Sequence, residues 1–558
     1  MASAVCELFP GTKVTIGPCI DDGFYYDFDT EQVFTPEDLL KIEGKMQEII
    51  KKNLPFVRQE ISRDQAVSFF EKKGEKYKVE IIQSLPKDEV ISLYQHGDFV
   101  DLCRGPHVAQ TGEIKAFHLL SVAGSYWRGD EKREKLQRIY GTAFANDKEL
   151  KEYLQRLEEA QKRDHRKLGR ELDLYTFHPE APASPFFLPK GALIYRLLID
   201  YIRNFYSRDG YSEVITPEIL DVELWKRSGH FDHFRENMYF TEAEERQMAV
   251  KPMNCPGHCL MFGEKKWSYR DLPIRFADFG RLHRFERSGV THGLTRVRTF
   301  SQDDAHIFCT REQMDLEISS FIKLVWEIYH DFGFESVQVA VATRPKNFQG
   351  EVSLWDEAEA TLKSALQKEK VEFTINEGEG AFYGPKIEFQ VKDALHRAWQ
   401  LGTLQVDFSM PERFDLNYIT SEGTKARPVM LHRAVLGSLE RFIGILVEHC
   451  GGAFPLWLAP VQVLLIPISA EQADYANGIK KQLEEAGLRV EIDTRNEKLG
   501  LKIREAQLKK INYMAVMGGK EVTAQVLSVR HRKEGDLGSM DLASLKKRLQ
   551  EEINNKIT

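Results

Sequence analysis

The sequence predicts a multidomain protein that combines α/β and α+β architecture, and three observations support this prediction. Its 558 residues exceed what one hydrophobic core can organise, which indicates three or four domains. Between Pro273 and Phe308, two extended, alternating segments flank a polar, glycine-containing turn, which is typical of an antiparallel hairpin with a long loop. After Pro460, apolar strand-like runs alternate with helical segments, which predicts a small domain with a parallel or mixed sheet.

The composition describes an ordinary globular protein with 42% hydrophobic and 29% charged residues. No apolar run approaches the ~20 residues that span a bilayer, and no signal peptide precedes the first charged segment, so we expect a cytoplasmic protein without membrane contact. Seven cysteines, an odd number, favour reduced thiols. The net charge of −8 does not indicate a nucleic-acid partner, although residues 460–558 hold 17 Lys+Arg against 14 Asp+Glu.

Four segments follow one another along the chain. We expect a first domain of short strands and helices at 1–149, and an exposed connecting helix at 150–171, where charged residues surround leucines at helical spacing. A group of prolines then opens a third segment, 172–459, which begins with an amphipathic helix near Gly191 and a strand that stops at Pro217. The last domain should contain strands at 461–467, 488–493 and 513–517, with helices at 470–486 and 498–510.

A candidate metal centre combines the thiol of Cys255 with the imidazoles of His306 and His432. Such a set suits zinc and leaves a coordination position open for a substrate. The spacing alone is weak evidence, because a chain with 16 His and 7 Cys offers many such triples. His258, three positions after Cys255, is an alternative ligand that we rank as a supporting residue.

Longer strings carry a family resemblance. Arg284-Phe285-Glu286, inside the predicted hairpin, resembles the Arg-x-Glu of motif 2 in class II aminoacyl-tRNA synthetases, and the segment 437–442 resembles motif 3, a helix that bears an arginine. The helix, strand and proline at 191–217 resemble motif 1, the dimer interface of that class, although a helix packed on its own core would look the same. With the candidate zinc ligands included, the whole chain is similar to the bacterial-type threonyl-tRNA synthetases.

The resemblance implies a fold and an activity. The fold would be a class II antiparallel-sheet catalytic core, with an α+β editing-like domain before it and an α/β anticodon-binding domain after it. The activity would be threonine–tRNA ligation: ATP-dependent activation of L-threonine to threonyl-adenylate, and transfer to the 3′ end of tRNA(Thr) by a homodimer. Rival interpretations are a prolyl, glycyl or histidyl enzyme of the same class, and a non-catalytic RNA-binding regulator.

Residue roles also follow from the resemblance. Polyphosphate needs fixed positive charge, which arginine supplies through paired donors, and a Mg²⁺ ion that bridges the ATP phosphates. Arg284 would contact the α-phosphate, Glu286 the adenine side and Arg441 the γ-phosphate. Further residues of the nucleotide site are Arg296 at the phosphates, Phe300 stacked on adenine, and Ser438. His230 would lie near the terminal ribose of tRNA, where a histidine that titrates near neutrality can relay a proton.

The expected zinc has a specific purpose, because threonine and valine have nearly the same shape. A site that binds the hydroxyl rejects the analogue without it by roughly 10⁴–10⁵. One zinc per chain, expanding to five-coordinate, could bind the amino group and the hydroxyl together. The resemblance places five residues around the amino acid, with Asp304 paired to the hydroxyl: Gln302, Asp304, Tyr383, Lys386 and Gln405.

Serine keeps the hydroxyl, and one methyl group is worth only about 1–3 kcal/mol, so a hydrolytic second site is expected. Cys103 and His107, in the string 101–107, resemble the threonyl-type editing domain. Relatives carry a His-x-x-x-His pair just before the segment that matches 2–10, whereas the first histidine here is His96. Either the chain starts late or the activity is lost. We favour a late start and expect threonine charging with poor clearance of serine.

Three residues of the last domain match family positions that read anticodon bases. Loop bases are recognised by stacking and by hydrogen bonds to their edges, which amide, carboxylate and guanidinium groups can supply. The residues are Asn496, Glu521 and Arg530.

Overall fold

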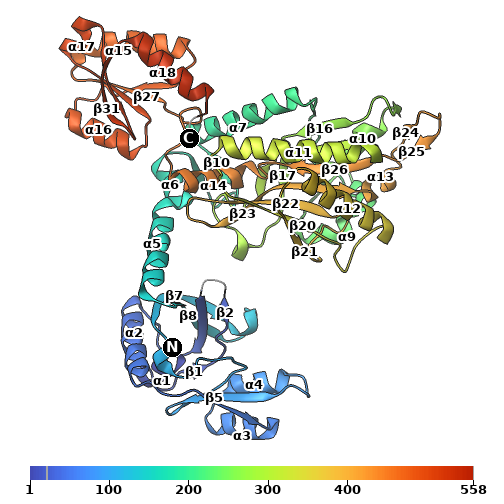
Figure 1. Ribbon diagram of the computed structural model, residues 1–558, viewed down its shortest axis with the longest axis vertical. Helices are drawn as coiled ribbons and strands as arrows, with labels where there is room; N and C mark the ends of the chain where they lie inside the picture. The colour runs from blue at the N-terminus through green and yellow to red at the C-terminus, as the bar shows by residue number, and fades with distance from the viewer. Residues whose placement is uncertain (21–22, 557–558) are drawn as a thin grey trace. The chain divides into compact units, whose positions relative to one another are not determined.

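The computed structural model describes residues 1–20 and 23–556, and the chain divides into two compact units, 1–158 and 159–558 (Figure 1). Within the described residues, no helix combines the length and apolar character that a membrane crossing needs. Each unit has its own hydrophobic core, as the length of the chain predicts.

The first unit is α+β. Its larger sheet has the order β1-β3-β8-β7, with β2 paired to β3, and a smaller sheet has the order β4-β5-β6. The apolar face of α2 packs against β7, and Ile42 and Leu119 are both buried in the core between them. The elements are α1 (Ala2–Leu8), β1 (Lys13–Val14), β2 (Cys19–Ile20), β3 (Gly23–Asp29), α2 (Pro36–Lys51), β4 (Val57–Ile61), α3 (Arg63–Lys72), α4 (Lys76–Ser84), β5 (Ile91–His96), β6 (Phe99–Leu102), β7 (Ala116–Tyr126) and β8 (Lys135–Phe144).

The segment expected as one exposed connecting helix is two helices, and this part of the prediction is wrong. Helix α5 (Asp147–Arg163) is largely exposed, but α6 (His165–Glu171) buries His165 and Leu168. The break lies at Asp164, whose carboxylate accepts a hydrogen bond from the Arg166 N–H at 2.8 Å and caps the second helix. Leucine spacing could not reveal this break, because the burial of His165 depends on Glu448, which is distant in sequence.

An eight-stranded sheet forms the centre of the second unit, in the order β11-β16-β19-β26-β23-β22-β20-β21. All pairs are antiparallel except the outermost pair at each edge. The strands are β11 (Ser212–Glu213), β16 (Ile274–Asp278), β19 (Asp304–Cys309), β20 (Val337–Ala342), β21 (Thr374–Asn376), β22 (Lys386–Lys392), β23 (Ala398–Asp407) and β26 (Val429–Ala434). The class II type of antiparallel core is thereby confirmed.

The predicted hairpin between 273 and 308 is confirmed. Strands β16 and β19 pair antiparallel, and β17 (Arg281–His283) continues the hairpin by pairing with β18 (Thr299–Ser301). The connection between β17 and β18, residues 284–298, is called the 284–298 loop below. The strand expected at 211–216 is reduced to β11, because this edge strand has a partner on one side only and both of its side chains are exposed.

Helices cover one face of the central sheet and carry much of its core. Helix α11 contacts β23 and lies beside α12, and residues of α7, α11, α12 and α14 share one buried apolar cluster (Figure 1). These helices are α7 (Pro189–Arg208), α11 (Arg311–Asp331), α12 (Val352–Lys368) and α14 (Leu439–Cys450). Shorter elements are α8 (Val222–Ser228), α9 (His230–Phe234), α10 (Cys255–Gly263), α13 (Ser409–Arg413), β9 (Tyr175–Phe177), β10 (Pro185–Phe187), β12 (Ile219–Asp221), β13 (Tyr239–Ala243), β14 (Arg246–Val250), β15 (Trp267–Ser268), β24 (Tyr418–Ile419) and β25 (Lys425–Ala426).

The C-terminal part has a mixed five-stranded sheet in the order β28-β27-β29-β30-β31, so the predicted small α/β domain is confirmed. The first three strands are parallel and the last two pairs are antiparallel. Its elements are β27 (Val463–Pro467), α15 (Ala473–Glu485), β28 (Val490–Ile492), α16 (Leu499–Leu508), β29 (Tyr513–Met517), α17 (Gly519–Ala524), β30 (Leu527–His531), β31 (Gly535–Met540) and α18 (Leu542–Asn554).

Candidate functional site

The backbone register of the central sheet assembles a row of candidate residues. His306 lies directly opposite His432, His432 opposite Gln405, and Gln405 opposite Lys386. Because side chains alternate between the two faces of a strand, paired residues share one face. The intervening residues, such as Leu431 and Ile307, are buried in the core on the other face. Four separated stretches of sequence therefore meet in one line.

Cys255 completes the candidate metal centre from a different element. It is the first residue of α10, and its sulfur and one ring nitrogen from each of His306 and His432 lie within 4.8 Å of one another. Nε2 of His306 is 2.9 Å from Nδ1 of His432. All three side chains are buried. The structure thus brings together the three residues that the sequence predicted as ligands.

The outer nitrogens of both histidines are engaged. Nε2 of His432 lies 2.9 Å from the carboxylate of the buried Asp407, and Nδ1 of His306 lies 2.8 Å from Nδ1 of His258. These contacts aim the inner nitrogens at each other, as second-layer partners do in zinc sites. Burial raises the pKa of the Cys255 thiol and lowers the pKa of His306. A thiol and two imidazoles that converge on one point fit a zinc ion, which would replace the thiol proton.

Residues expected around the amino acid lie beside this centre. The Asp304 carboxylate accepts a hydrogen bond from the Asn254 amide at 3.1 Å and lies 3.8 Å from His306. The Tyr383 hydroxyl donates to the Gln405 side chain, and the Tyr383 ring lies 5.2 Å from the ring of His432. The list of expected residues is completed by Gln302, which forms an isolated β-bridge with Ser438, and by Lys386, whose ammonium is 2.6 Å from Glu388.

The expected nucleotide residues cluster on the hairpin. The Arg284 guanidinium lies 5.0 Å from the ring centroid of the buried Phe300, and Glu286 pairs with Arg296 at 3.0 Å. In this arrangement Arg284 covers a face of the Phe300 ring, on which adenine was expected to stack. The hairpin therefore places the Arg284 guanidinium against the Phe300 ring, with a second guanidinium, that of Arg296, paired to Glu286.

Arg441 is the second expected phosphate ligand. Its backbone N–H donates to Ser438, which caps α14, and its guanidinium lies 5.7 Å from the Trp399 ring. Among the described residues, its buried Nε has no hydrogen-bond partner. Burial lowers the pKa of Arg441, and the charge of Arg296 adds to this effect. An under-satisfied buried guanidinium is suited to an anionic phosphate.

His230 differs from the expectation in its titration. Its Nε2 lies 3.8 Å from the Cys255 sulfur, and its Nδ1 is 2.8 Å from the Ser228 hydroxyl. Burial lowers the pKa of His230 to about 3, and the charge of Arg284 contributes in the same direction. The imidazole is therefore neutral at physiological pH rather than half-protonated, and so low a pKa makes it a weak proton acceptor.

Sequence reasoning missed three carboxylates of this region. Asp407 holds His432, Asp278 lies near Lys251 and His258, and Asp303 accepts hydrogen bonds from the N–H groups of residues 435, 436 and 437. Burial raises the pKa of Asp303 to about 7. A signal existed for Asp407: it stands two residues after Gln405, and residues two apart on a strand share a face. Asp303 and Asp278 had no such marker.

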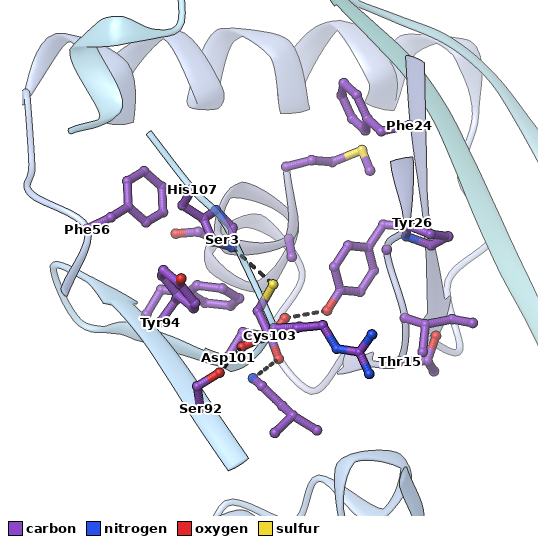
Figure 2. Close-up of a pocket in the computed structure, with 18 of the residues that line it drawn as sticks. Ser3, Thr15, Phe24, Tyr26, Phe56, Ser92, Tyr94, Asp101, Cys103 and His107 are labelled. Atoms are coloured by element: carbon purple, nitrogen blue, oxygen red, sulfur yellow. Dashed lines mark hydrogen bonds between the residues drawn. The ribbon is translucent and has the colours of Figure 1, made fainter. Parts of the chain in front are cut away.

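The first unit contains a separate cavity of about 730 Å³ (Figure 2). Cys103 and His107 both line it, with 3.1 Å between sulfur and Nε2, and Tyr94 and Phe56 flank the histidine ring. Asp101 on the same side is held by the Lys78 ammonium at 2.6 Å and the Tyr26 hydroxyl at 2.5 Å. Burial lowers the pKa of His107. The predicted pair therefore lies at the wall of a sizeable pocket.

The expected anticodon residues lie in the C-terminal α/β domain, and only Arg530 is part of its sheet. Asn496 follows β28, Glu521 lies in α17 after β29, and Arg530 is opposite Met514 in β30. Since β28 and β29 are both parallel to β27, Asn496 and Glu521 lie toward the same edge of the sheet. The Glu521 carboxylate accepts the Gly518 N–H at 2.8 Å, and Asn496 is exposed.

Three family models match the chain. They describe the tRNA synthetase class II core domain (G, H, P, S and T) at residues 239–450, an anticodon binding domain at 462–552, and the threonyl and alanyl tRNA synthetase second additional domain at 91–140. These matches follow the division of the structure into an α+β unit, a class II core and a C-terminal sheet.

Curated relatives match over the full chain. A threonine–tRNA ligase of Acetivibrio thermocellus is 55% identical over 556 residues, covering 100% of this chain and 87% of that protein. A threonine–tRNA ligase of Clostridium acetobutylicum is 54% identical over 558 residues, with the same coverage.

Solved structures are also similar. The RNA binding domain of threonyl-tRNA synthetase from Cryptosporidium parvum Iowa II has a TM-score of 0.66 and 44% identity, covering 70% of this chain and 98% of that chain. Prolyl-tRNA synthetase from Cryptosporidium parvum, complexed with L-proline and AMP, has a TM-score of 0.55 at 17% identity over 70% of this chain and 76% of that chain, a likeness of fold alone.

Proposed function

The chain belongs to the threonine–tRNA ligases, which are class II aminoacyl-tRNA synthetases, and on this premise we propose that Cys255, His306 and His432 bind one zinc ion that selects threonine. The observation that carries the proposal is the convergence of one sulfur and two ring nitrogens within 4.8 Å, with both outer nitrogens already engaged. When bound, the zinc would offer an open Lewis-acid position to the amino group and hydroxyl of threonine.

The surrounding side chains would orient the amino acid. Asp304, fixed by the Asn254 amide, accepts a hydrogen bond from the threonine hydroxyl, and Gln405 and Tyr383 bound the pocket from the next strand and loop. Valine cannot make these polar contacts and would leave buried polar groups without partners. We also assign Gln302 and Lys386 to this pocket, since Lys386 belongs to the same cross-strand row.

Activation would use the cluster on the hairpin. Arg284 and Arg441 bind the phosphates of ATP, with Mg²⁺ bridging the polyphosphate, while Arg296, Phe300, Glu286 and Ser438 form the rest of the nucleotide site. A guanidinium with an unpartnered buried Nε gains a partner when phosphate binds, which favours the bound state. His230, next to the centre, would accept a hydrogen bond from the terminal ribose hydroxyl and so orient it during transfer.

ATP–pyrophosphate exchange with three amino acids tests the selection of threonine. We expect exchange with threonine and with serine, and at least about 10⁴-fold weaker exchange with valine, because valine lacks the hydroxyl. Metal analysis should find close to one zinc per chain, and a chelator should abolish exchange. Equal exchange with valine and threonine would contradict the assignment.

The same proposal covers partners and place of action. Residues 172–459 activate the amino acid, 460–558 bind the anticodon of tRNA(Thr) through Asn496, Glu521 and Arg530, and the enzyme acts in the cytoplasm as a homodimer.

The edge strand β11 and the 89% exposed Ile215 support a dimer interface next to α7. Ile215→Asp should shift the protein toward monomer in size-exclusion chromatography, whereas Leu316→Asp, at another exposed apolar residue, should not.

A second proposal concerns residues 1–149, which we assign, with 150–171 as a linker, to the aminoacyl end of tRNA. The cavity of about 730 Å³ is large enough to admit a terminal nucleotide and its amino acid, and Cys103 and His107 provide a polar pair at its wall. We propose that this pair takes part in the clearance of seryl-tRNA. Deacylation of purified seryl-tRNA measures it, and a rate equal to that without the protein would contradict the proposal.

A further inference from the structure

A completely buried histidine lies between the end of α14 and the 284–298 loop. His165, the first residue of α6, has 0% exposure. Its Nδ1 lies 2.6 Å from the Glu448 carboxylate in α14, and its Nε2 accepts a hydrogen bond of 3.0 Å from the Leu294 N–H in the loop. We propose that His165 is a positioning residue that holds the 284–298 loop in its nucleotide-binding conformation.

The two contacts define one tautomer. Since a backbone N–H can only donate, Nε2 carries no proton, and Nδ1–H donates to the carboxylate. The same carboxylate oxygen accepts the His165 backbone N–H at 3.0 Å, and the Tyr175 hydroxyl donates to the His165 carbonyl at 2.6 Å. His165 is thus held by four hydrogen bonds, two at its imidazole and two at its backbone, so its acceptor nitrogen has a defined direction toward the loop.

A metal site is the alternative interpretation of this cluster. Asp164, His165 and Glu448 have potential ligand atoms within 4.8 Å of one another. Both nitrogens of His165 are already used in hydrogen bonds, however, and Asp164 is occupied as the cap of α6, where Arg166 also pairs with it at 2.5 Å. The geometry therefore favours a hydrogen bond to the loop over a metal site.

Two glycines make room for this contact. Gly293 has a φ of +47°, and a Cβ there would lie 2.2 Å from Nε2 of His165. A Cβ at Gly444, in α14, would lie 3.1 Å from the Leu294 side chain and 3.5 Å from the His165 ring. Leu294 itself is fully buried. The loop and the ring are therefore packed against each other without space for another methyl group.

The hydrogen bonds continue from His165 toward the second phosphate ligand. Glu448 pairs through its other oxygen with Arg397, which donates to Asp393 at 2.8 Å, and Asp393 also accepts the indole N–H of Trp399 at 2.9 Å. Arg441 lies over the Trp399 ring at 5.7 Å. At the other end, Leu294 is two residues before Arg296. One chain of contacts thus links Arg441 to the loop that carries Arg296.

This inference depends on the proposed nucleotide site, because it assigns His165 an effect on ATP through Arg296. If the Leu294 N–H loses its acceptor, the loop has no polar anchor at this point, and the cost appears when ATP requires its ordered conformation. The expected signature is a higher KM for ATP, with the KM for threonine unchanged and a smaller change in kcat.

Two substitutions distinguish the roles of the two imidazole nitrogens. In His165→Gln the side-chain amide reaches the position of Nε2, so its oxygen can accept the Leu294 N–H. In His165→Asn the shorter amide reaches only the position of Nδ1 and contacts Glu448. We expect His165→Asn to raise the KM for ATP in pyrophosphate exchange about tenfold, and His165→Gln to stay within about threefold of the parent. His178→Gln, at an exposed histidine of the same unit, is the matched control.

Gly293→Ala provides a second measurement that keeps His165 and Glu448 intact. Its Cβ would force the loop away from Nε2, so the KM for ATP should rise even where His165→Asn fails to fold, as monitored by thermal melting. Arg296→Ala should raise the KM for ATP if the nucleotide site is assigned correctly. An effect of Arg296→Ala without any effect of His165→Asn and Gly293→Ala overturns the positioning role alone. If Arg296→Ala leaves the KM for ATP unchanged, the nucleotide assignment is wrong. If His165→Asn and His165→Gln raise the KM for ATP equally, the acceptor nitrogen does not hold the loop, and the inference is overturned.

Discussion

The candidate metal centre and the N-terminal cavity each place a cysteine close to histidine, but they hold these side chains in different ways. At the centre, His306 and His432 stand on adjacent strands, and each outer nitrogen has a buried partner. In the cavity, Cys103 and His107 belong to one short segment after β6, and His107 is exposed and borders about 730 Å³ of open space. Paired neighbouring strands fix the directions of the candidate ligands, which suits a metal ion. A short segment beside a large cavity leaves room for a bulky substrate.

The largest expected effect is the loss of a ligand from the centre. Cys255→Ala removes the sulfur from a buried site in which the two nitrogens alone cannot complete a zinc set. We expect metal content below a tenth of an equivalent per chain and about 10⁴-fold weaker threonine-dependent exchange. Cys259→Ala, one turn further along α10 and outside the ligand set, is the control for packing. Retained zinc in Cys255→Ala would show that the centre is held by other atoms.

An intermediate effect is expected from the layer behind the ligands. Asp407→Asn keeps the size of the side chain but removes the charge that orients His432, and this should weaken zinc affinity about 10–100-fold in competition with a chelator. Asp415→Asn, at an exposed carboxylate of the same unit, should leave the affinity unchanged. Identical affinities for the two variants would mean that strand register alone aims the imidazole.

The smallest effect should come from the cavity. Cys103→Ala changes a residue of the other compact unit, so threonine-dependent exchange should stay within about twofold of the parent. The seryl-tRNA deacylation rate should fall to the uncatalysed rate. A large loss of exchange in Cys103→Ala would remove the distinction between the two regions.

Much of the fold was predictable because it depends on local patterns. The hairpin around Arg284 and the mixed C-terminal sheet follow from alternation and from turn residues, and both are confirmed. The break at Asp164 was missed, although its cap is local. The burial of His165, which distinguishes the second helix, depends on Glu448, 283 positions later.

The candidate site divides in the same way. Its ligands were found because Cys and His are rare and chemically marked, and the structure brings all three together. Their partners were missed, because an aspartate such as Asp303 carries no mark until the turn at 435–437 is folded against it. Neither the seryl-tRNA prediction nor the anticodon residues Asn496, Glu521 and Arg530 are tested by the fold.

The cross-strand row through Lys386, Gln405, His432 and His306 limits how this protein can change during evolution. A one-residue insertion or deletion inside β26 would send His432 into the apolar core and bring Leu431 or Arg433 to the substrate, with no half-way state. These strands therefore cannot gain or lose a single residue without disrupting the row. A change in amino-acid preference must come from substitutions at the fixed positions of the row, whereas the connecting loops can lengthen.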